Sequence, residues 1–182
     1  KIFKLSAVAL MMTSAAAFAD TVTVVTSFSK DLTDPFKAAF EAAHPDTTLE
    51  VVNRNTNAAV SYLQETRGSN TTDLMWASAP DAFEVLKEDG LLAKVDVQFE
   101  GIPDQIGGYP VHDADGTYYG FAASGYGIMY NTRYVEANEL PVAKEWEDLK
   151  RAEYNGHVAM SSPSRSGTTH LTVETVLQGE GW

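Results

Sequence analysis

The chain has 182 residues, with 13 Lys or Arg against 25 Asp or Glu, so its formal net charge is −12. A hydrophobic content of 44 % and a charged content of 21 % are typical of a folded globular protein. The acidic balance argues against nucleic-acid binding and against a basic membrane-surface helix, because both need clustered cations. The absence of cysteine excludes disulfides, Cys-based zinc sites, iron–sulfur clusters and thiol catalysis.

The first 19 residues have the pattern of a secretory signal peptide. Lys1 and Lys4 precede an apolar, alanine-rich run over residues 5–18, and residues 17–19 form a small-x-small cleavage site. This run is shorter than the roughly 20 residues that a membrane-spanning anchor needs. We therefore expect cleavage before Asp20 and export of a soluble mature chain to the periplasm.

Residues 20–92 alternate between strand and helix patterns. One apolar face, for example, is formed by Leu32, Phe36 and Phe40, which recur every four residues as in a helix. Strands are predicted at 21–26, 49–52 and 73–78, and helices at 32–43, 58–67 and 81–89. Three successive strand–helix units predict an α/β fold, with a parallel sheet covered by helices.

The pattern changes after residue 92. Residues 95–117 are irregular. After them, strands are predicted at 117–121, 128–130 and 158–160. A short helix is predicted within 141–151, and a further helix from 168 or 169 toward 177. Glycines at 120, 125 and 127 suggest a crossover between two units. Because the second unit holds only one and a half strand–helix units, too few for a core of its own, we infer that the chain is truncated.

The segment Ser161–His170 is the most informative one for function. It leads into a predicted helix, where Gly167 permits a tight turn and where Thr168 and Thr169 offer N–H and hydroxyl groups. A helix N-terminus with free N–H groups attracts phosphate or carboxylate. The same residues are equally compatible with an ordinary N-cap in a Ser-rich loop. A P-loop is excluded, because no Gly-Lys-Ser/Thr follows.

Polar residues also follow each strand of the first unit. In an open parallel sheet, ligands bind beyond the carboxyl ends of the strands. The three loops contain Ser27 and Ser29, then Asn55, Thr56 and Asn57, then Ser78, Pro80 and Asp81. Each loop alone is an ordinary turn or cap. Together they predict a polar cleft lined by hydroxyls and amides.

Catalysis and metal binding have weaker support. Ser164, His170 and Glu174 provide the residue types of a hydrolytic triad, but no Gly-x-Ser-x-Gly elbow is present, and the last two are simply i and i+4 on one helix. Tyr118 and Tyr119 are candidate phenolate ligands, although adjacent strand residues point to opposite faces. We expect no catalytic residue, no metal and no cofactor.

Several segments resemble the extracellular solute-binding proteins of bacterial ABC importers, in the iron(III)-transport-like branch. They are the signal peptide, residues 22–30 and 73–92, the Gly-Tyr-Gly-Ile-Met-Tyr-Asn-Thr run at 125–132, and Pro141-x4-Trp146-x-Asp148-Leu149. The loop Ser161–His170 is similar to a sub-branch that binds phosphorylated sugars or phosphonate-like solutes. The resemblance implies a type II periplasmic-binding-protein fold, with lobe 1 at 20–127, the first part of lobe 2 at 128–182, and the ligand held between them.

The function predicted from the sequence is capture of a small anionic or phosphorylated solute, such as a hexose phosphate, for a membrane permease. We expect a monomer that closes about a hinge at Gly125, Tyr126, Gly127 and Ile128. The candidate ligand-binding residues are Ser27, Thr56, Asn57, Ser78, Ser164, Ser166, Gly167, Thr168, Thr169 and His170. Two alternatives stay open at this point, a ferric-ion or ferric-chelate carrier and a secreted hydrolase. The family's iron-binding Tyr pair lies downstream of this sequence, so it does not map onto Tyr118 and Tyr119.

Overall fold

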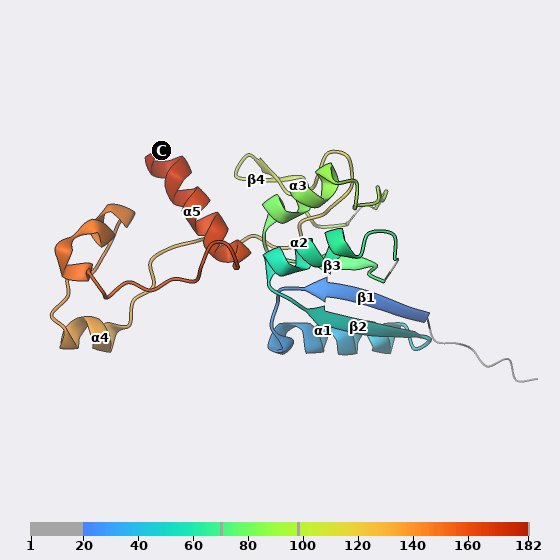
Figure 1. The fold of residues 1–182 in the computed structure, drawn as a ribbon, viewed down its shortest axis with the longest axis horizontal. Helices are drawn as coiled ribbons and strands as arrows, with labels where there is room; N and C mark the ends of the chain where they lie inside the picture. The colour runs from blue at the N-terminus through green and yellow to red at the C-terminus, as the bar shows by residue number, and fades with distance from the viewer. Residues whose placement is uncertain (1–19, 70, 98, 182) are drawn as a thin grey trace, which may run out of the picture.

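The computed structural model describes residues 20–69, 71–97 and 99–181, and the predicted signal peptide lies outside them. Figure 1 shows an α/β unit joined by a long extended segment to a smaller helical part. The predicted alternation of strands and helices in the first unit is confirmed. Its elements are β1 (Asp20–Thr26), α1 (Lys30–Ala43), β2 (Thr47–Asn53), α2 (Thr56–Glu65), β3 (Leu74–Trp76) and α3 (Pro80–Glu88).

The three strands form a parallel sheet in the order β2-β1-β3. Thr26, the last residue of β1, is level with Asn53 on β2 and with Trp76 on β3. The carboxyl ends of all three strands therefore meet at one edge. In Figure 1 the arrowheads of β1 and β2 end at this edge, on the side of the sheet unit nearer the helical part.

The hydrophobic core lies between the sheet and the pair α2 and α3. Val25 and Met75 project from the sheet into a cluster with Ala59 of α2 and with Ala82 and Leu86 of α3. Small residues on both helices let them approach the sheet closely. Helix α1 covers the opposite face (Figure 1), so the sheet lies between two helical layers.

The next segment contains a hairpin, and an ion cluster fastens it to α3. The hairpin joins β4 (Gln105–Ile106) to β5 (Tyr109–Pro110) through Gly107 and Gly108, whose φ angles of 59° and 85° are those that a two-residue hairpin turn requires. The Lys87 ammonium lies 2.6 Å from the Asp113 carboxylate and 2.8 Å from that of Asp115. The predicted strand at 117–121 is reduced to a single bridge between His112 and Tyr119.

Asp113 is the buried member of this cluster, with 5 % of its side chain exposed. Burial alone opposes ionisation of the carboxyl. The hydrogen bonds from Lys87, from the side chain and backbone N–H of Thr117, and from the backbone N–H of Asp115 outweigh that effect, so the pKa of Asp113 lies well below its usual range. The carboxylate stays charged and holds the crossover segment against α3.

The rest of the chain is helical or irregular. It contains α4 (Thr132–Ala137), two short 3-10 helices, η1 (Trp146–Lys150) and η2 (Ala152–Tyr154), and α5 (Gly167–Glu180). The predicted helix within 141–151 is thus a 3-10 helix, and the helix predicted from 168 or 169 begins at Gly167. Residues 121–131, which include the predicted hinge, form neither helix nor strand. Within the described ranges, no helix has the length and apolar character needed to cross a bilayer.

The predicted strands at 128–130 and 158–160 are wrong. Both segments are extended but lack a strand partner among the described residues. Their apolar side chains face solvent, with 96 % of Met129, 51 % of Val158 and 61 % of Met160 exposed. An apolar run becomes a strand only where a neighbouring strand accepts its backbone hydrogen bonds, and the described chain provides none there.

Candidate functional site

The first turn of α5 packs against the carboxyl edge of the sheet. A Cβ atom on Gly167 would lie 2.6 Å from the Ala79 Cβ and 3.0 Å from the Thr56 Oγ1. Gly167 is the first residue of α5, Thr56 the first of α2, and Ala79 the N-cap of α3. The N-termini of three helices therefore converge at one point, and only glycine permits this approach.

The convergence has an electrostatic consequence. Each helix N-terminus carries a partial positive charge from its unpaired N–H groups. Ser166 accepts a hydrogen bond from the Thr169 N–H at 3.2 Å, and Asn55 accepts one from the Ala58 N–H at 3.0 Å. The N–H groups of Gly167 and Thr168 have no acceptor in the part of the chain that the structure describes. Three positive helix ends with unused donors are chemically suited to an anion.

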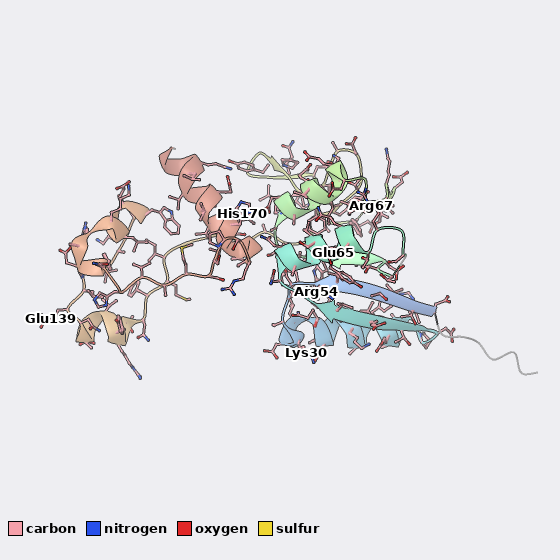
Figure 2. The ribbon with its side chains drawn as sticks, in the orientation of Figure 1. Lys30, Arg54, Glu65, Arg67, Glu139 and His170 are labelled. Atoms are coloured by element: carbon pink, nitrogen blue, oxygen red, sulfur yellow. The ribbon has the colours of Figure 1, made fainter. Side chains whose placement is uncertain are left out.

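Side chains also join α5 to the sheet unit. The Asn57 amide donates to the Ser164 carbonyl oxygen at 2.6 Å. The His170 Nδ1 lies 2.7 Å from the Asp81 carboxylate of α3, and its Nε2 lies 3.7 Å from Glu174. Figure 2 shows His170 on the part of α5 nearest the sheet unit. The other Asp81 oxygen is buried and has no hydrogen-bond partner among the described residues, so it could accept a hydroxyl donor.

The predicted site residues divide into two groups. Six of them come together where α5 meets the sheet edge, namely Thr56, Asn57, Ser164, Ser166, Gly167 and His170. Thr169 is buried beside them, whereas the Thr168 side chain is exposed. Ser27 and Ser78 lie half-buried at the ends of β1 and β3, with no hydrogen bond to the six within the described residues.

Two residues of this contact were not among the predicted ligands. Ala79 provides the small surface under Gly167, and Asp81 provides the partner of His170. The position of Asp81 in the first turn of a predicted helix marked it as an edge residue. Its pairing with a residue 89 positions later is not visible in any local pattern, since it depends on where α5 lies.

The geometry does not assemble the hydrolytic triad. The Ser164 hydroxyl contacts the Ser162 hydroxyl at 2.8 Å, while His170 contacts Asp81 and Glu174. A nucleophilic serine needs a hydrogen bond to its base, and no such bond joins Ser164 to His170 among the described contacts. The arrangement therefore disfavours the hydrolase alternative.

The two tyrosines are held apart by different partners. The Tyr118 hydroxyl donates to Glu84, and the Tyr119 hydroxyl donates to the Val95 carbonyl. Burial, together with the Glu84 hydrogen bond, raises the pKa of Tyr118 above its usual range and keeps the phenol protonated. Within the described residues, no group of three His, Asp or Glu side chains has the geometry of a metal site. These contacts disfavour a phenolate pair for ferric iron at this position.

Comparison with known proteins identifies the family. Residues 69–182 match the bacterial extracellular solute-binding protein family, and the chain belongs to that family. It is similar to the phosphoglycerate transport regulatory proteins PgtC of Salmonella typhimurium and Salmonella typhi, each 30 % identical over 172 residues. The alignment covers 94 % of this chain but 42 % of either relative, so the chain spans about two fifths of their length. The family predicted from the sequence is thereby confirmed, and the relatives agree with a sub-branch for phosphorylated solutes.

Proposed function

We propose that this chain is the solute-capturing part of a periplasmic binding protein, which holds a small phosphorylated solute and delivers it to a membrane permease. The observation that carries the proposal is the contact of Gly167 with Thr56 and Ala79, which brings three helix N-termini together. Phosphate oxygens accept hydrogen bonds from such N–H groups and neutralise the converging helix dipoles. The protein binds and releases its solute without chemical change.

The relatives narrow the range of solutes to test. Their printed name refers to phosphoglycerate transport, and we propose a three-carbon phosphate ester as the first ligand of this chain. A hexose phosphate or a phosphonate has the same anionic group and belongs in the same panel. Short-range N–H donors hold such an anion despite the net charge of −12, because surface charges are screened by salt within about 10 Å.

Solute capture would use the two-lobe arrangement expected for the family. We propose that residues 20–127 form the first lobe, that residues from 128 onward contribute to the second, and that the irregular stretch around Gly125–Ile128 is the hinge. The pairs Asn57–Ser164 and Asp81–His170 are then contacts between the lobes. A solute that touches both lobes favours the closed state by its differential affinity for it.

Thermal-shift titration of the full-length protein tests the proposal. The panel contains 3-phosphoglycerate, glycerol 3-phosphate, glucose 6-phosphate, inorganic phosphate, unphosphorylated glucose and ferric citrate. A ligand at about 100 times its Kd stabilises the folded state by about 2.7 kcal/mol, which raises Tm by several degrees. We expect phosphate esters alone to produce this shift.

A matched pair of variants locates the site. Thr168→Ala together with Thr169→Ala alters the first turn of α5, whereas Thr175→Ala alters an exposed threonine of the same helix beyond that turn. We expect the first variant to reduce the phosphate-ester shift and the second to retain it. A shift with ferric citrate only would refute the proposed function, and equal shifts in both variants would refute a role of the Thr168 and Thr169 side chains in the site.

A further inference from the structure

His170 joins two of the three converging helices. It is the fourth residue of α5, and its Nδ1 lies 2.7 Å from the Oδ2 of Asp81, the second residue of α3. Its other ring nitrogen, Nε2, lies 3.7 Å from the Oε1 of Glu174, one turn further along α5. Figure 2 shows His170 on the part of α5 that lies nearest the sheet unit. One imidazole is therefore placed between two carboxylates, one from each of the two helices.

The proton on His170 decides how well this arrangement is satisfied. A neutral imidazole has one N–H donor and one nitrogen with a lone pair, so only one of its nitrogens donates to a carboxylate. The other nitrogen then presents its lone pair to a negatively charged oxygen. An imidazolium has N–H donors on both nitrogens and a positive charge, so it attracts both carboxylates. Protonation of His170 therefore strengthens the contact between α5 and α3, and loss of the proton weakens it.

The side chains that face His170 from each neighbouring element are acidic or uncharged. Among the described residues, Asp81 and Glu174 are the acidic side chains within 4 Å of its ring nitrogens. The first turn of α2, the third element at this contact, presents uncharged side chains. The cation nearest in sequence, Arg165, is an exposed residue of the loop before α5. The N-terminal ends of α3 and α5 carry partial positive charges of about half a unit each, which the two full carboxylate charges outweigh.

The chemistry of imidazole sets the pH range in which the contact changes. Imidazole is the side chain that ordinarily changes its charge between about pH 5 and pH 8. The three side chains are between 36 % and 41 % exposed, so the proton exchanges with solvent. Because protonation favours the contact, its stabilising effect is present at the lower end of this range and is lost as pH rises. By linkage, a solute that closes the contact also takes up protons.

We propose that His170, held between Asp81 and Glu174, is a proton-dependent latch that makes solute capture tighter at mildly acidic pH than at alkaline pH. The proposal rests on the proposed function, in which the contact between α5 and α3 joins the two lobes and closes on a phosphorylated solute. It gives His170 a positioning role, because the side chain stabilises the closed state and needs no contact with the solute. A rise in pH then lowers the affinity through one imidazole.

The test is a pH series of calorimetric titrations with 3-phosphoglycerate on the full-length protein. The phosphate group of the solute also gains a proton near about pH 6, so the readout is the ratio of the variant Kd to the wild-type Kd at each pH, from which this ionisation cancels. His170→Gln keeps a side-chain N–H donor for Asp81 but does not titrate. At about pH 5.5 we expect the wild type to bind about 2- to 10-fold more tightly than His170→Gln, the range for two partly exposed ion pairs. At about pH 8 we expect the two proteins to bind equally.

Proton uptake provides a second readout, which a purely structural contact would not change. Titration at about pH 6.5 in buffers with different heats of ionisation measures the number of protons bound together with the solute. We expect the wild type to take up a larger fraction of a proton than His170→Gln. Glu174→Gln removes the more distant carboxylate and should give an intermediate value. The matched control is His44→Gln, the same substitution at the C-cap of α1, just before β2 begins at the opposite edge of the sheet, and it should equal the wild type.

The outcomes separate failure of this inference from failure of the proposed function. Equal pH profiles and equal proton uptake in the wild type and in His170→Gln overturn the latch while phosphate capture stands. A loss of affinity in His170→Gln that is the same at every pH also overturns the latch, because a structural contact without a proton has that effect. If 3-phosphoglycerate fails at every pH to bind a wild-type protein with a cooperative melt, both proposals are overturned.

Discussion

Substitution of Gly167 by alanine is the most direct test of the contact between α5 and the sheet edge. The added Cβ would lie 2.6 Å from the Ala79 Cβ, a separation that real Cβ contacts essentially never show. It would also lie 3.0 Å from the Thr56 Oγ1. Both neighbours are short and buried, so neither can swing aside, and α5 must move away from α2 and α3.

The size of the effect follows from the packing. Overpacking by one methyl group in a tight contact costs about 1–3 kcal/mol. If solute capture requires the three helix N-termini to converge, this cost appears in the binding equilibrium as an affinity about 5- to 150-fold lower. The fold of the sheet unit is unaffected, because Gly167 lies outside the core formed by β1, β3, α2 and α3.

Calorimetric titration with 3-phosphoglycerate measures this loss in the full-length protein. Gly179→Ala is the matched control, because a Cβ at that exposed position of α5 meets nothing within 4 Å. It should bind normally and be more stable by about 0.5–1 kcal/mol, the usual gain for Gly→Ala in a helix. Adding Ala79→Gly to Gly167→Ala removes the closest clash and should restore part of the affinity. Wild-type affinity in Gly167→Ala would refute the reasoning.

Three further predictions concern single contacts. Asn57→Ala removes the bond to Ser164 and should weaken solute binding about 2- to 10-fold by calorimetry, whereas unchanged affinity would exclude an inter-lobe role. Ser166→Ala removes a helix cap and should cost about 0.5–2 kcal/mol in urea unfolding, with Ser166→Gly costing less. Because the pKa of Asp113 is lowered in the folded state, its stabilising effect is complete above about pH 3.9 and is lost as pH falls below that value. Lys87→Met should lessen this acid dependence of the urea midpoint, and an unchanged pH profile would contradict the assignment.

The first unit was predictable because its elements are specified locally. The β-branched run at 21–26 and the four-residue spacing of apolar residues in α1 identify strand and helix without knowledge of the tertiary structure. The helix predicted at 32–43 begins at Lys30, since helix ends depend on caps rather than on the apolar face. The runs at 128–130 and 158–160 carry similar local signals but fail as strands, because a strand also needs a partner.

The candidate site was predictable only in part. The caps at Asn55 and Ser166 are local, so the sequence placed polar groups at the ends of the strands and at the start of α5. The sequence also suggested a cleft of hydroxyls and amides without charges. That expectation missed the contact of the Asp81 carboxylate with His170, which exists only in the folded chain.

The sequence by itself determined the strand–helix alternation and the family, because short-range periodicity and motif spacing carry that information. The tertiary structure alone decided that Gly167 lies against Ala79 and Thr56, and that His170 pairs with Asp81. These contacts join residues about 90 or more positions apart, and they depend on the path of the long irregular segment between the two parts. No local pattern encodes that path, since each of its residues is compatible with many backbone conformations and the packing of α5 against the sheet edge selects one.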